Sequence, residues 1–158
     1  MSDAPDYKST LQLPVTDFPM KASLALREPD SVRKWRETGL YQRILAARAQ
    51  GPKFVMHDGP PYANGNIHQG HVLNKVLKDF VVKSRTMAGY FVDYIPGWDC
   101  HGLPIELKVD RGSGGGKATQ SENEFRGACR DYAQKWVDVQ SAEFQRLGVF
   151  GRWDRPYL

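Results

Sequence analysis

The sequence predicts an α/β fold built around one parallel βαβ unit. Two short apolar segments, residues 53–57 and 90–95, flank residues 69–87, whose apolar side chains recur with helical spacing. Strand, helix and strand within this length favour two parallel strands joined by a right-handed crossover. The chain of 158 residues is long enough for one domain with its own core.

The amino-terminal part is predicted to be an arm followed by helices. Residues 1–27 show no clear period and contain three prolines, so we expect an extended arm that lies on the body. Glu28-Pro29-Asp30 predicts a helix start, because proline suits the first helical position and acids suit the positive end of the helix dipole. Gly39 is expected to divide the following helical pattern into two pieces. We assign residues 1–52 to this arm and helical extension.

The helix over residues 69–87 has the clearest pattern in the first half, and Gly89 is expected to end it. Its predicted buried stripe consists of Leu73, Val76, Leu77, Phe80 and Val81. Three lysines lie off that stripe and are expected to form a solvated face: Lys75, Lys78 and Lys83.

Two further helices are expected in the second half. Pro104 predicts the first residue of a short helix reaching about Asp110. The capping box Ser121-Glu122-Asn123-Glu124 opens a long helix that Gly148 closes. The glycine-rich residues 112–117 between them are predicted to be a flexible loop and not a phosphate loop, because an alanine follows the lysine.

Composition narrows the class of protein. The excess of 22 basic over 18 acidic residues permits a polyanionic partner without requiring one. The two cysteines, Cys100 and Cys129, lack the spacing of a disulfide framework and indicate a reducing compartment. The first residues include acids where a secretory signal has bases, and no apolar run approaches a membrane span. We therefore expect a cytoplasmic protein without a membrane partner.

The strongest functional signal is the run Pro-Pro-Tyr-Ala-Asn-Gly-Asn-Ile-His-Gln-Gly-His at residues 60–71. It joins a predicted strand to a predicted helix, where a helix N-terminus can bind phosphate. His68 and His71 share one helical face and can stabilise charge on a transferring phosphoryl group, while Gly70 leaves room for a base or phosphate. Taken alone, such a histidine pair is a weak signal, and metal ligation with Cys100 or His101 is a less favoured alternative.

Two blocks together carry a resemblance to a family. Residues 57–71 and the block Gly-Trp-Asp-Cys-His-Gly-Leu-Pro-Ile-Glu at residues 97–106 resemble the amino-terminal part of bacterial-type isoleucyl-tRNA synthetases. Residues 68–71 resemble the class I motif His-Ile-Gly-His, with glutamine in the variable second place. Residues 7–11, 18–20 and 153–158 resemble the same family, so the resemblance spans nearly the whole chain.

The resemblance implies a reaction, in which ATP activates isoleucine to its adenylate and the isoleucyl group is transferred to tRNA(Ile). His68 and His71 would be catalytic, and Asp99 would bind the α-ammonium group of isoleucine. Pro60 and Pro61 would shape the amino-acid pocket. The ATP-binding residues would be Gly59, Asn64, Gly65, His68, Gly70 and His71. Mg²⁺ would enter with ATP, no residue of this chain is expected to bind a metal, and zinc is possible only in the family's carboxy-terminal part.

The resemblance also implies an incomplete catalytic domain. Residues 53–158 would form the first half of a class I synthetase Rossmann fold, ending where the editing domain is inserted. The chain lacks the Lys-Met-Ser-Lys-Ser motif that completes the family's ATP site, so little activity is expected without the remainder of the synthetase. The alternatives are a leucyl- or valyl-type synthetase segment, a small two-histidine nucleotidyltransferase, and a non-catalytic segment that binds ATP or tRNA.

Overall fold

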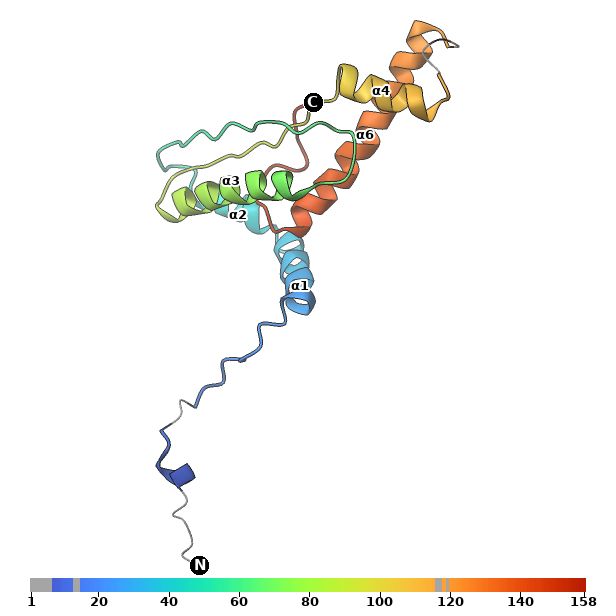
Figure 1. Ribbon diagram of the computed structural model, residues 1–158. Coiled ribbons are helices and arrows are strands. Elements are labelled where there is room, and N and C mark those ends of the chain that lie inside the picture. Colours follow the sequence, from blue (N-terminus) through green and yellow to red (C-terminus); the bar gives the residue numbers. More distant parts are fainter. Residues whose placement is uncertain (1–6, 13–14, 116–117, 119) are drawn as a thin grey trace, which may run out of the picture.

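The computed structural model describes residues 7–12, 15–115, 118 and 120–158. The remaining residues, which include parts of the predicted arm and of the glycine-rich loop, lie outside this description. Within the described residues, the elements are the 3-10 helix η1 (Tyr7–Thr10) and the α-helices α1 (Leu24–Glu37), α2 (Leu40–Ala47), α3 (Gln69–Met87), α4 (Leu103–Gly112) and α6 (Glu122–Arg146). Helix α4 lies beside the amino-terminal part of α6, and α1 meets the opposite end of α6 (Figure 1).

The described part of the amino-terminal segment leads away from the helices (Figure 1). All of its described side chains are exposed, including the apolar Val15, Phe18 and Met20. The expectation that this arm lies on the body is therefore wrong. Its apolar residues follow neither helical nor strand periodicity, so they form no single face that could pack against the helices.

Helix α1 begins a turn earlier than the sequence predicted. Ser23 adopts a left-handed conformation with φ of 48°, and its carbonyl accepts hydrogen bonds from Leu26 N and Arg27 N. This turn starts the helix upstream of Pro29, which then lies inside α1 instead of in its first position. The predicted division at Gly39 is confirmed, because this residue separates α1 from α2 with φ of 56°.

The three later helices confirm the sequence pattern. Helix α3 has the predicted bounds, and Gly89 follows its end with φ of 98°. Helix α4 includes Pro104 in its first turn. The capping box at the start of α6 is formed, since Glu124 N donates to Ser121 Oγ and Ser121 N donates to the Glu124 carboxylate.

The buried face of α3 differs from the predicted one. Lys75, Asp79 and Val82 are its buried residues, whereas Leu73, Leu77 and Phe80 are 63%, 52% and 62% exposed. The prediction that Lys75 belongs to a solvated face is wrong. The periodic pattern is read from apolar residues alone, so it does not predict which charged residues are buried. A buried charge is tolerated where it is paired and hydrogen-bonded, as Lys75 is.

The predicted sheet is not confirmed, because the described residues contain no β-strand and only isolated bridges. Residues 53–57 and 90–95 meet at one parallel bridge, Lys53–Phe91. Val55 is 86% exposed, so no packing supports a longer ladder between these two segments. The other edge of residues 90–95 is bound by a side chain, since Tyr41 Oη donates to Val92 O and accepts from Tyr94 N.

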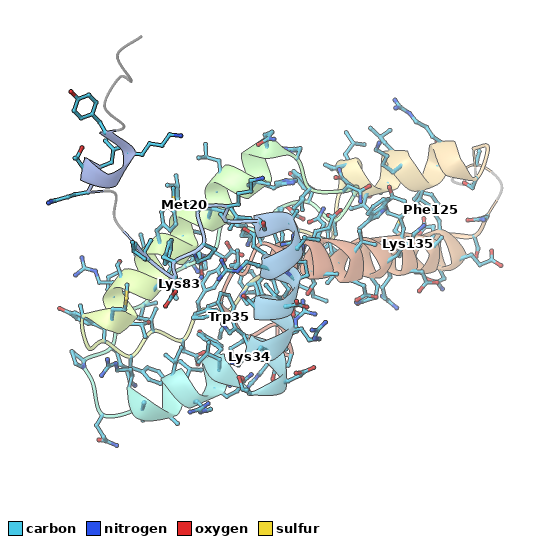
Figure 2. All side chains as sticks on the ribbon, turned by 90° about the horizontal axis from the view of Figure 1, so that it is seen from below. Met20, Lys34, Trp35, Lys83, Phe125 and Lys135 are labelled. Atoms are coloured by element: carbon cyan, nitrogen blue, oxygen red, sulfur yellow. The ribbon has the colours of Figure 1, made fainter. Side chains whose placement is uncertain are left out.

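The core has two parts. The larger lies between α4, α6 and the adjoining loops, and Phe125 sits between the two helices (Figure 2). Its buried residues are Ala63, Trp98, Ile105, Val109, Phe125, Ala133, Val137 and Phe144. The smaller part is formed by Val82, Val92, Tyr94 and Val149, which join α3 to the segments before α4 and after α6.

Lys83 ties α3 to α1 and to the segment after α6. Its ammonium group lies 4.4 Å from the Phe150 ring centroid and 5.7 Å from that of Trp35, and it donates to Gly148 O at 3.0 Å (Figure 2). The contact with Trp35 joins α3 to α1, and the contacts with Phe150 and Gly148 join α3 to the segment after α6.

Asp58 has four hydrogen-bond donors around it among the described residues, and we call its contacts the Asp58 node. Its carboxylate accepts hydrogen bonds from Lys75 Nζ, from Lys78 Nζ at 2.5 Å and from Gly97 N at 3.0 Å, and its carbonyl accepts from Tyr157 Oη at 2.9 Å. Burial alone would raise the pKa of Asp58, but the lysines and the Gly97 amide outweigh it and hold the pKa below its ordinary value. The node joins four separate segments.

Replacing Asp58 with asparagine is expected to destabilise the fold by about 3–5 kcal/mol, because the buried Lys75 ammonium loses its carboxylate. Urea unfolding at neutral pH measures this change. Asp30→Asn is the matched control, since it removes a carboxylate from an exposed ion pair with Arg33 and should have a several-fold smaller effect. Equal losses in the two variants would contradict the central role of the node.

The stabilisation that the Asp58 carboxylate provides depends on pH. Because the folded-state pKa of Asp58 lies below its ordinary value of 3.8, the stabilisation is fully present above about pH 4 and is lost as the pH falls through the folded pKa. The stability difference between the wild type and Asp58→Asn should therefore shrink in acid. If this stability difference instead grew as the pH fell, the folded-state pKa of Asp58 would lie above its ordinary value, contrary to the lowering caused by the lysines and the Gly97 amide.

Candidate functional site

The two predicted catalytic histidines cap α3. His68 is the N-cap residue: its Nδ1 accepts from Gly70 N at 3.1 Å, and its own N donates to His71 Nδ1 at 3.4 Å. The rings stack with centroids 3.8 Å apart and an interplanar angle of 19°. Since each Nδ1 accepts a backbone N–H, each neutral ring carries its proton on Nε2. The pair can therefore present two imidazole donors at the positive end of a helix.

Gly70 is required by the histidine arrangement itself. A Cβ at this position would lie 3.0 Å from His68 Cε1 and 3.1 Å from His68 Nδ1. The sequence interpretation assigned the space above Gly70 to a base or phosphate. The structure fills it with the His68 ring.

His71 is the less exposed of the two rings. Burial lowers the pKa of His71 below its ordinary value of 6.5, the positive charges of His68 and Lys75 lower it further, and the Glu143 carboxylate partly opposes the shift. His71 is thus predominantly neutral at physiological pH, with its proton on Nε2. It can donate a hydrogen bond to a phosphate oxygen without being an imidazolium ion.

The structure brings the predicted ATP-binding loop and the predicted amino-acid-binding residue together. Asp99 N donates to Pro61 O at 2.8 Å, and Ala63 N donates to Asp99 O at 3.0 Å. These two bonds form the parallel bridge between Tyr62 and Asp99. In the same loop Gly59 and Pro60 are exposed. Three other residues predicted to belong to the site are only partly buried: Pro61, Asn64 and Gly65.

The Asp99 side chain is held by its own turn. Its Oδ1 accepts from His101 N at 3.2 Å, which forms an Asx turn, and the residue is partly exposed. The turn fixes where the carboxylate lies and leaves it accessible to a small cation.

One face of α6 holds the loop. Tyr132 Oη donates to Asn64 O, Gln140 Nε2 donates to Tyr62 O and Gly65 O, and the Glu143 carboxylate accepts from Asn66 Nδ2 and Ile67 N. The sequence interpretation missed Gln140 and Glu143. Gln140 and Glu143 follow Tyr132 and Trp136 at helical spacing. This spacing could have predicted that both polar residues lie on the same face of the helix.

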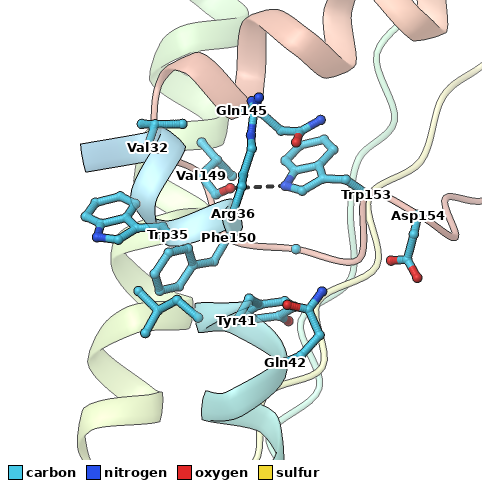
Figure 3. Close-up of a pocket in the computed structure, with 13 residues that line it drawn as sticks. Val32, Trp35, Arg36, Tyr41, Gln42, Gln145, Val149, Phe150, Trp153 and Asp154 are labelled. Carbon is cyan, nitrogen blue, oxygen red and sulfur yellow. Dashed lines mark hydrogen bonds between the residues drawn. The ribbon is translucent and has the colours of Figure 1, made fainter. Parts of the chain in front are cut away.

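Several cavities among the described residues lie outside this arrangement, and two of them are close to α6 or the segment that follows it. One of about 250 Å³ lies between α1, α2 and residues 148–154 and is lined by Trp35, Tyr41 and Phe150, with Trp153 Nε1 donating to Val149 O at its edge (Figure 3). Another of about 610 Å³ lies between α4 and α6 and contains both cysteines in its wall. None of the predicted site residues lines either cavity.

Within the described ranges, no group of three or more His, Cys, Asp or Glu side chains is arranged to hold a metal ion. Within the same ranges, no helix combines the length and apolarity needed to cross a membrane.

Comparison with known families decides the classification. Residues 30–158 match the family described as tRNA synthetases class I (I, L, M and V). The chain belongs to this family. The class I synthetase membership that the two sequence blocks implied is thereby confirmed, and it assigns the chain to the class I fold.

The synthetase chain is similar to several bacterial proteins named isoleucine–tRNA ligase. It is 58% identical over 153 residues to that of Nitratidesulfovibrio vulgaris and 59% identical over 153 residues to that of Methylococcus capsulatus. In both comparisons 97% of this chain is covered, but the chain spans only 16% of the relative's length. Among solved structures, a LeuRS of Agrobacterium radiobacter K84 in a ternary complex with tRNA and LeuAMS shares the fold, with a TM-score of 0.65 and 24% identity over 87% of this chain and 16% of that one.

Replacing His68 with asparagine is expected to raise the pKa of His71, because it removes a neighbouring positive charge while asparagine still caps the helix. The pKa should remain below 6.5, since burial is the largest cause of the shift. Titration of the imidazole Cε1–H resonances by NMR measures it. His101→Asn removes a histidine from the loop after Asp99 and should leave the pKa of His71 unchanged. A fall in that pKa after His68→Asn would contradict the described electrostatics.

Proposed function

We propose that this chain carries the first half of the catalytic site of an isoleucine–tRNA ligase, with residues 1–52 as an extension and 53–158 as half of the catalytic domain. The identity of 58–59% with relatives of that name supports the proposal. The observation that carries it is the stacked His68–His71 pair at the N-terminus of α3, beside a loop that is bonded directly to Asp99.

The first step is nucleophilic substitution at phosphorus. The carboxylate of isoleucine attacks the α-phosphate of ATP, pyrophosphate leaves, and isoleucyl-adenylate forms. The Nε2–H groups of His68 and His71, together with the N-terminus of α3, stabilise negative charge on the phosphates during this transfer. Gly59, Asn64 and Gly65 complete the chain's share of the ATP site, and Gly70 contributes by leaving room for the His68 ring.

Mg²⁺ enters as a partner of the ATP phosphates. The carboxylate nearest the start of the loop, Asp58, is already engaged by Lys75 and Lys78. The loop therefore meets the nucleotide with imidazoles and backbone amides, and Mg²⁺ bound to ATP would supply charge neutralisation for the phosphates.

The amino acid is bound on the other side of the loop. The Asp99 carboxylate pairs with the α-ammonium group of isoleucine, and its Asx turn holds it in place. Pro60 and Pro61 form an apolar wall for the aliphatic side chain. Because Pro61 and Asp99 are joined by a backbone hydrogen bond, the wall and the charge partner keep a fixed separation.

In the second step the isoleucyl group passes to tRNA(Ile), which requires the remainder of the longer synthetase. The exposed Leu73, Leu77 and Phe80 on α3 give that remainder an apolar surface to cover. The relatives' greater length supports this arrangement.

Isoleucine-dependent ATP–pyrophosphate exchange by the protein as its gene encodes it tests the function. His68→Asn, which keeps the helix cap, is expected to lower kcat by about 10²–10³ fold, because it removes a donor used in the transition state. Isoleucine binding, measured by calorimetry, should change far less.

Gln69→Ala is the matched control, because Gln69 is the exposed neighbour of His68 and should be replaceable without loss of exchange. Equal losses in kcat and isoleucine affinity in His68→Asn would exclude the transition-state role. Exchange that depends on leucine or valine instead of isoleucine would show that the substrate assignment is wrong.

A further inference from the structure

Gln140 is fully buried on α6 and bonds to two separate segments. Its Oε1 accepts from Trp98 Nε1 at 2.9 Å. Its Nε2 donates to Tyr62 O at 3.1 Å and to Gly65 O at 2.6 Å. Both amide hydrogens and the amide oxygen are therefore used, and each bond joins α6 to a loop that is distant in sequence.

The chemistry of these three partners requires glutamine. An indole N–H can only donate, so it fixes the position of the amide oxygen, and the two carbonyls can only accept, so they need both amide hydrogens. Glutamate of the same shape has no donor when ionised, and methionine offers no donor and only a weak sulfur acceptor. Because Gln140 is fully buried, leaving any of these three groups without a hydrogen bond would lower the stability of the folded state.

The two joined segments carry the proposed ATP-binding and amino-acid-binding residues of this half of the active site. Gly65 belongs to the ATP loop, and Trp98 directly precedes Asp99, the proposed partner of the α-ammonium group. We infer that Gln140 is a positioning residue that sets the ATP loop against the amino-acid segment, so that the carboxylate of isoleucine meets the α-phosphate. This role rests on the proposed function, since it concerns the relative placement of those two substrates.

Neighbouring contacts of the same face of α6 support the positioning role of Gln140. One turn further along α6, the Glu143 carboxylate accepts from Ile67 N at 2.9 Å, directly before the first catalytic histidine. The backbone bonds between Asp99 and residues 61 and 63 lie between the two segments that Gln140 holds. Loosening Gln140 should therefore disturb the distance between the substrates more than the binding of either one.

The test uses Gln140→Glu and Gln140→Met in the protein as its gene encodes it, assayed by isoleucine-dependent ATP–pyrophosphate exchange. Gln140→Met is expected to lower kcat by about tenfold to a hundredfold, with the KM values for ATP and isoleucine changed by less than about threefold. This deficit should not vary with pH, because the substituted side chain does not titrate.

Gln140→Glu has a different pH profile. Burial opposite two carbonyl oxygens raises the pKa of the substituted carboxyl group, and only its protonated form can donate to one of them. Its deficit relative to the wild type should therefore be larger at about pH 8 than at about pH 6. The comparison is made as kcat per folded molecule, because a side chain that merely supports the fold would change the folded fraction with pH but not this rate.

Gln134→Glu and Gln134→Met are the matched controls, because Gln134 lies exposed on the same helix and donates to Asp138. They should exchange at the wild-type rate. Hydrogen exchange adds a direct readout: the amides of Ala63 and Asp99 should lose protection in Gln140→Met, while amides in the middle of α3 keep theirs.

The outcomes distinguish failure of the proposed function from failure of the proposed role of Gln140. A wild type without isoleucine-dependent exchange refutes the proposed function. An active wild type with both Gln140 variants within about twofold of its kcat overturns the role of Gln140. Loss of exchange that follows only the unfolded fraction, with kcat per folded molecule unchanged, overturns that role as well.

Discussion

The carboxylate of Asp58 is buried, and two lysines of α3 must stay beside it. A buried carboxylate is tolerated only when it is fully paired, so its partners from α3 and from Gly97 have to be in place together. Tyr157 adds a hydrogen bond to the carbonyl of the same residue. Asp58 also begins the loop that carries the proposed ATP-binding residues. The start of the site is thus fixed by the same ion pairs that hold the fold together.

The end of that loop is fixed independently. Helix α6 bonds to residues 62–67 through Tyr132, Gln140 and Glu143, and α3 begins immediately afterwards with the capping histidines. A loop anchored at both ends can present glycines and backbone amides without much flexibility. Such preorganisation suits phosphoryl transfer, which depends on positioning and charge stabilisation.

Local patterns in the sequence predicted local structure well. Periodicity and Gly89 located α3, the Ser121–Glu124 box located the start of α6, and the spacing of His68 and His71 placed both rings together. Features that depend on distant partners were missed. Lys75 is buried because Asp58 and Tyr94 are beside it, and Gln140 matters because Trp98 and Gly65 surround it. A helical pattern contains no information about partners so far away in the chain.

The hydrogen bond from Tyr157 to the Asp58 carbonyl spans 99 residues of sequence. During synthesis at about 5–20 residues per second, the start of the loop therefore leaves the ribosome roughly 5–20 s before the tyrosine that completes its anchoring. Throughout that interval the carbonyl of Asp58 lacks its Tyr157 donor, while the lysines and Gly97 that bind its carboxylate are made before Tyr157 is. The loop that carries the family's first motif is thus synthesised well before its anchoring can be completed.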